Sequence, residues 1–129
     1  MKMCLHMPPW GTVEPTIELM EAISLMGDNV IERAFSEYDQ ESEMRKAEGK
    51  GPRPGKQSCV NKVLKEKFQN AGWDCGSSYF KKNGTWIRVS FRHYQTIGSD
   101  ILEAMHQCIN CDAKLAVIAV GNQESLPKL

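Results

Sequence analysis

The stretch YFKKNGTWIRVSFRHY, residues 79–94, decides the fold. Asn83-Gly84 separates two runs of alternating residues, and both central positions of a type I′ turn need a positive φ, which Asn and Gly tolerate. A two-residue turn at 83–84 places Tyr79 opposite Arg88 and Phe80 opposite Ile87. The stretch therefore predicts a β-hairpin with strands at about 76–82 and 85–93.

The alternation divides this hairpin into two faces. Phe80, Ile87 and Val89 share one face, which we predict to be core. The opposite face is polar and is predicted to lie toward solvent. Its candidate binding residues, together with those at the end of the second strand, are Tyr79, Arg88, Ser90, Arg92 and His93. Ligands of open α/β sheets bind at strand ends, and these cationic and aromatic side chains suit phosphate or carboxylate groups.

The whole chain, residues 1–129, is predicted to form one domain. Residues 1–14 form an N-terminal arm, and 15–46 a helical segment with apolar residues at spacings of three and four, kinked or divided at Gly27-Asp28. EGKGPRPGKQ, residues 48–57, is a basic loop, read either as a plain surface loop or as a phosphate-contacting one. A second helix begins at a Ser58 cap and stops at Gly72 within an α/β core spanning 58–121, and 122–129 form a tail.

The end of the core predicts a crossover back to the sheet. A helix over about 99–112 carries a stripe that we expect to be buried: Ile101, Ala104, Met105, Cys108 and Ile109. The apolar run KLAVIAVG, residues 114–121, is typical of a strand buried on both faces. Strand, helix and strand in this order form a βαβ unit. The predicted fold class is α/β, with a mixed sheet of three to four strands flanked by helices.

The composition restricts the classes of function. Lys+Arg and Asp+Glu are both 16, so the formal net charge of +0 does not favour avid binding to nucleic acid. The sequence lacks an apolar run long enough for a membrane span and starts without a signal-peptide core, so we expect a cytoplasmic protein with no membrane partner. Its five cysteines are then expected to be reduced thiols.

Two further groups could carry chemistry. Cys108-x-x-Cys111 closes a helix, where the dipole opposes a thiolate, and no second ligand pair has matching spacing, so we predict no metal and no cofactor. Asp74, Asp100 and Glu103 flank the hairpin and the following helix. For Asp100 and Glu103 the expected role is to complement the helix dipole, with a displaced catalytic carboxylate as the alternative.

The order of helix, hairpin, crossover helix and apolar strand over residues 58–121 resembles the core of PD-(D/E)XK nucleases. The segment GWDCGSSYFKKNGTWIRVSFRHYQTIGSDILEAMHQ is most similar to the BglII-type restriction endonucleases, with Phe80, Val89, Phe91 and Tyr94 as the shared apolar skeleton. Such enzymes hold Mg²⁺ through two carboxylates. Here the resemblance places Tyr79, Arg88 and Ser90 at the catalytic positions, which implies that no residue of this set is catalytic.

Three functions remain compatible with these observations. The first is a catalytically degenerate relative of these nucleases that binds nucleic acid through the polar face of the hairpin. The second is a small homodimeric protein-interaction module with no role in nucleic-acid binding. The third is an enzyme of unrecognised chemistry at the strand end that holds Arg92 and His93.

Overall fold

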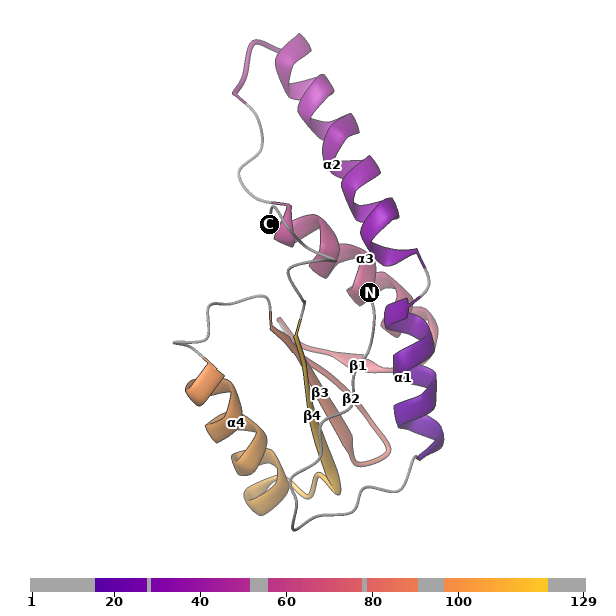
Figure 1. The fold of residues 1–129 in the computed structure, drawn as a ribbon, viewed down its shortest axis with the longest axis vertical. Helices are drawn as coiled ribbons and strands as arrows, with labels where there is room; N and C mark the ends of the chain where they lie inside the picture. Colours follow the sequence, from indigo (N-terminus) through magenta and orange to yellow (C-terminus); the bar gives the residue numbers. More distant parts are fainter. Residues whose placement is uncertain (1–15, 28, 52–55, 78, 91–96, 121–129) are drawn as a thin grey trace.

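A four-stranded mixed sheet forms the centre of the molecule, with strand order β1-β2-β3-β4 (Figure 1). In this computed structural model, the described residues are 16–27, 29–51, 56–77, 79–90 and 97–120. The strands are β1 (Asp74–Cys75), β2 (Tyr79–Lys82), β3 (Thr85–Ser90) and β4 (Leu115–Val120). The helices are α1 (Ile17–Gly27), α2 (Val30–Ala47), α3 (Gln57–Asn70) and α4 (Ile97–Asn110). The α/β class predicted from the sequence is confirmed.

The hairpin register agrees with the sequence prediction at each position. β2 and β3 are antiparallel, with Tyr79 opposite Arg88 and Phe80 opposite Ile87. Asn83 and Gly84 have φ values of 49° and 80°, as a type I′ turn requires. The first hairpin strand is shorter than predicted, since β2 begins at Tyr79. A separate short strand, β1, precedes it and pairs with β2.

Helix α3 lies on the face of the sheet that carries Phe80, Ile87 and Val89, and α1 and the base of α2 pack against α3 (Figure 1). Phe68 of α3 is fully buried at the centre of this layer. Its ring stacks on Phe80 at a centroid distance of 4.1 Å and meets the edge of Trp73 at 5.1 Å. The predicted core face of the hairpin is therefore correct, and buried Trp73 contacts Phe68 between α3 and β1.

Helix α4 covers the opposite face and connects β3 to β4, which pair in parallel. The crossover is as predicted, but β4 is an edge strand in the sheet of the described residues. Of its six residues only Ala119 is buried, so the prediction of a strand buried on both faces is wrong. An apolar run shows that a strand has apolar neighbours, and it does not show the position of that strand in the sheet.

The helix ends mostly agree with the predictions. The helical segment 15–46 is divided where expected, since α1 ends at Gly27 and Asn29 has a φ of 50° before α2. Helix α2 ends at Ala47, one residue after the predicted end of the segment. Helix α3 begins at Gln57 after Lys56, so Ser58 lies in its first turn and is not its cap. Gly72, with a φ of 85°, follows the end of α3 as predicted.

The helices of the described ranges are all too short or too polar to span a lipid bilayer. The longest of them, α2, extends away from the sheet (Figure 1) and is rich in charged residues. Its base packs on α3, where Val30 and Ala34 are buried.

Candidate functional site

The polar face of the hairpin is covered by α4, contrary to the sequence prediction. Ser90 and Trp86 are buried on this face, and Tyr79 remains the most exposed of its candidate residues. The physical reason is that α4 turns its own polar residues toward the sheet. Arg92 and His93 lie outside the described residues.

Arg88 is held in an ion pair by α4. Its Nε donates to Oδ1 of Asp100 at 2.8 Å, and Asp100 is only 1% exposed. Asp100 lies in the first turn of α4, where the helix dipole also favours its charge. A guanidinium with a buried carboxylate partner is largely neutralised, so Arg88 does not offer a free cation to a ligand.

Two polar atoms beside this pair have no partner among the described residues. They are Oδ2 of Asp100 and Nε1 of Trp86, both buried between the sheet and α4. The Tyr79 ring stacks on Trp86 at a centroid distance of 6.3 Å. It also covers Gly76 so closely that a Cβ there would overlap the ring. Of the predicted binding residues that the structure describes, Tyr79 and Arg88 are cross-strand partners, and Ser90 is buried one pleat further along β3.

The remaining acids do not complete a catalytic set with Asp100. Asp74 lies on β1 opposite Lys81, and Glu103 accepts a hydrogen bond from Gln107 one turn further along α4. Within the described ranges no three His, Cys, Asp or Glu side chains are grouped closely enough to hold a metal ion. Cys111 Sγ lies 3.7 Å from His106 Nε2, at the exposed end of α4.

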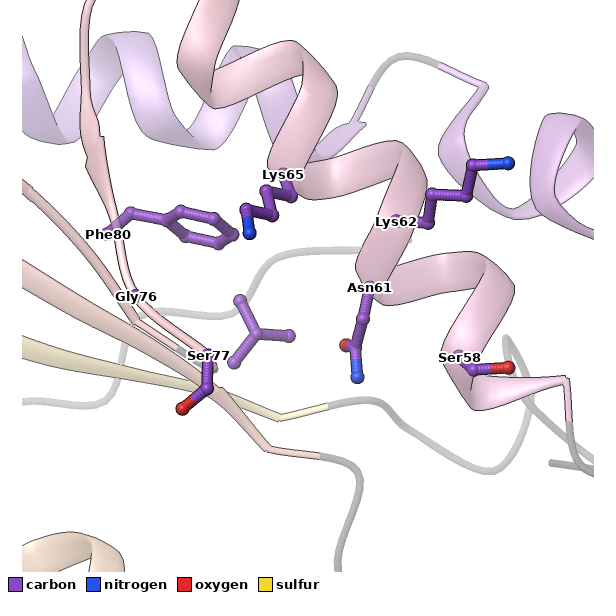
Figure 2. Close-up of a pocket in the computed structure, with 8 residues that line it drawn as sticks. Ser58, Asn61, Lys62, Lys65, Gly76, Ser77 and Phe80 are labelled. Carbon is purple, nitrogen blue, oxygen red and sulfur yellow. The ribbon is translucent and has the colours of Figure 1, made fainter.

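A hollow of about 240 Å³ opens on the other side of the sheet, between α3 and the connection from β1 to β2. Residues Ser58, Asn61, Lys62 and Lys65 of α3 line it, at the three- and four-residue spacing of one helical face. The sheet side is formed by Gly76, Ser77, Phe80 and Val89. In Figure 2 Lys65 extends toward the Phe80 ring and Asn61 points toward Ser77, while Lys62 points away from them.

Neither lysine of this hollow has an ion-pair partner among the described residues. Glu66, the acid next to Lys65 in sequence, is engaged by Arg33 at 2.7 Å. The first turn of α3 carries no acidic residue, so its N-terminal dipole is not compensated there by a side chain. The hollow therefore combines one unpaired cation directed into it, Lys65, with an amide and hydroxyl groups, a set that binds anions. Lys62 adds a second unpaired cation on the same helix, although its side chain points away from Asn61 and Ser77.

Cys75 lies beside this hollow and is not a nucleophile in it. Burial raises the pKa of the Cys75 thiol, against the opposing effect of the nearby Lys65 charge. The thiol lies 3.5 Å from the carbonyl oxygen of Trp73. A thiol whose pKa is raised is a weaker nucleophile at neutral pH than an ordinary cysteine.

Sequence reasoning missed this hollow because its residues form an ordinary polar helix face. The signal in the sequence was the basic loop 48–57, which leads directly into α3 and was interpreted as a possible phosphate contact. Comparison with family models, with curated proteins and with solved structures finds no match to this chain.

Proposed function

We propose that the protein binds phosphate groups of nucleic acid at the hollow between α3 and the sheet, without hydrolysing them. The observation that carries the proposal is the pair of unpaired lysines, Lys62 and Lys65, beside Asn61 and Ser77. A volume of about 240 Å³ is smaller than the pockets that enclose drug-sized ligands, and it suits one phosphate group with its solvent.

Nucleic acid is the proposed source of the phosphate for two reasons. The resemblance of residues 58–121 to PD-(D/E)XK nucleases favours it. The α3 side of the hollow also extends over about two helical turns, from Ser58 to Lys65, so a polymer could place one phosphate in it while its neighbours pass over the helix. The absence of hydrolysis is proposed because Tyr79 and Arg88 occupy the acidic positions of that resemblance, and Arg88 already compensates Asp100.

The test is fluorescence anisotropy with labelled duplex and single-stranded DNA over a range of salt concentrations. Binding is expected at about 50 mM salt and is expected to weaken steeply by about 200 mM, because phosphate contacts release counterions. The double variant Lys62→Glu/Lys65→Glu is expected to weaken binding at least tenfold. Arg88 is not a suitable test position, since its replacement by an acid would face buried Asp100 and unfold the protein.

The matched control is Lys46→Glu/Lys114→Glu, which changes the net charge equally at two exposed lysines away from the hollow. It is expected to bind within about twofold of the wild type at the same salt. Equal losses in both double variants, or no binding by the wild type at low salt, would contradict the proposed site. Nicking of the DNA in Mg²⁺ would contradict the absence of hydrolysis.

A further inference from the structure

Helix α4 turns polar residues toward the sheet and apolar residues toward solvent, the reverse of what a surface helix usually does. Its polar residues Asp100 and Gln107 face the sheet side, and Asp100 is the only one of its residues that is fully buried. Its apolar residues face outward: Ile109 is 72% exposed, Leu102 68% and Met105 52%. The stripe predicted to be core is therefore on the surface, and the ion pair of Asp100 with Arg88 fixes this orientation.

We define the α4 stripe as the large apolar residues that this helix exposes: Ile97, Ile101, Leu102, Met105 and Ile109. The stripe contains no charged side chain. From their exposed fractions these residues present roughly 550 Å² of mostly apolar surface, at the upper end of what a monomeric protein carries in one patch. An apolar surface of this size marks an interaction site.

The adjacent edge of the sheet extends this surface. β4 packs beside α4 (Figure 1) and has no neighbouring strand on its outer side among the described residues. Its sequence, LAVIAV, has no charge and no proline, the devices that normally protect an edge strand from pairing with another chain. Val120 at its end is 54% exposed.

We propose that α4 and the edge of β4 form the interface of a two-fold symmetric homodimer, in which the α4 stripe of one copy packs against that of the other. A two-fold interface brings the same patch of both copies together, so the patch must be complementary to itself. An uncharged stripe meets this condition, because antiparallel packing places apolar residues opposite apolar residues along its whole length.

The area also agrees with a second copy as the occupant. A stable interface buries about 800 Å² on each partner. The α4 stripe supplies roughly 550 Å² of mostly apolar surface, and exposed Val120 at the end of β4 adds to it. Interfaces between different proteins gain specificity from complementary charges, whereas the cores of homodimer interfaces are more apolar. The α4 stripe corresponds to the second kind.

The test measures the mass of the full chain by sedimentation velocity and light scattering over roughly 1 to 100 μM, a range that covers micromolar dissociation constants. The wild type is expected to reach twice the mass of the chain. Met105→Glu and Leu102→Glu are each expected to weaken self-association at least tenfold, because each places a charge in the apolar contact. Far-UV circular dichroism shows whether the variants keep their helices.

The matched control is Met20→Glu on α1, since Met20 is 56% exposed, close to the value for Met105, but lies on another face. This variant is expected to dimerise like the wild type. A wild type that remains monomeric at the highest concentration would overturn the proposal, whatever else covers the stripe. Dissociation by Met20→Glu, with a dimer retained in folded Met105→Glu, would also overturn it by placing the interface elsewhere.

Discussion

Arg88 and Asp100 together determine how the second layer of the molecule is built. Asp100 is nearly inaccessible to solvent, while the Arg88 side chain keeps 18% of its surface exposed. The two partners are therefore not equivalent. Removal of the cation leaves a buried charge without compensation, whereas removal of the acid leaves a guanidinium that can turn toward water.

This asymmetry gives a stability prediction. Arg88→Met is expected to lower the free energy of unfolding by about 3 kcal/mol, because buried Asp100 loses its partner. Asp100→Asn is expected to cost clearly less. The double variant Arg88→Met/Asp100→Leu is expected to regain most of the loss, since apolar residues can replace a buried pair. Urea denaturation followed by tryptophan fluorescence measures all three, and equal losses in the two single variants would contradict the account.

At this scale the sequence determined local pairing and not long-range pairing. The register of β2 and β3 could be predicted to the residue, because Asn83-Gly84 fixes the turn and pairing propagates along the strands. The contact of Arg88 with Asp100 crosses residues 91–96 and depends on which way α4 is rotated. No local sequence pattern indicates how α4 is rotated about its axis. The polar face of the hairpin was therefore predicted to be exposed, whereas α4 covers it.

Among the elements, α1 is joined to the hairpin by two carboxylates, those of Glu21 and Glu18. Glu21 accepts a hydrogen bond from Nε1 of Trp73 at 2.6 Å and pairs with Nζ of Lys82 at 3.1 Å. Near the turn, Asn83 donates to Glu18 at 3.1 Å. The hydrogen bond from Trp73, and then that from Lys82, lower the pKa of Glu21 below its ordinary value of 4.5.

The lowered pKa of Glu21 predicts an acid-sensitive contact between α1 and the sheet. A carboxyl group with a depressed pKa stabilises the fold above pH 4.5, and this contribution is lost as the pH falls through the lower folded value. In Glu21→Gln the thermal midpoint is expected to fall less steeply below pH 4.5 than in the wild type. Thermal melts from pH 3 to pH 7 measure the difference. Glu43→Gln, at an exposed pair on α2, serves as the control and is expected to follow the wild type.

The helices and strands could be predicted from the sequence. Which side of each helix is buried could not always be predicted. The apolar stripe of α3 is buried at Val60, Val63, Leu64 and Phe68. The equally clear stripe of α4 is exposed. Both helices have the same apolar periodicity, and periodicity indicates a face that is apolar without indicating what covers it. A stripe that is buried in the core and a stripe that stays exposed look alike in a single sequence.

For the whole molecule, the balance of charges affects how the protein can associate and bind. The formal net charge of +0 means that copies of the chain do not repel each other at long range. Binding of an anion must then rely on a local group such as Lys62 and Lys65 rather than on overall charge.

The α/β class and the parallel return of β4 were predictable from the order of the elements. The place of β4 at the edge was not, because a buried strand and an interface strand can share one apolar sequence.

If the dimer forms through α4, the stability of the fold depends on protein concentration. Only folded chains associate, so mass action stabilises the folded state. The apparent thermal midpoint then rises as the protein concentration increases. Between roughly 2 and 200 μM the wild-type midpoint is expected to rise by several degrees. The Met105→Glu midpoint is expected to stay constant over the same range, and Met20→Glu to follow the wild type. Scanning calorimetry or dye-free fluorescence melts measure the series, and a wild-type midpoint that does not change with concentration would contradict the coupling of dimer and fold.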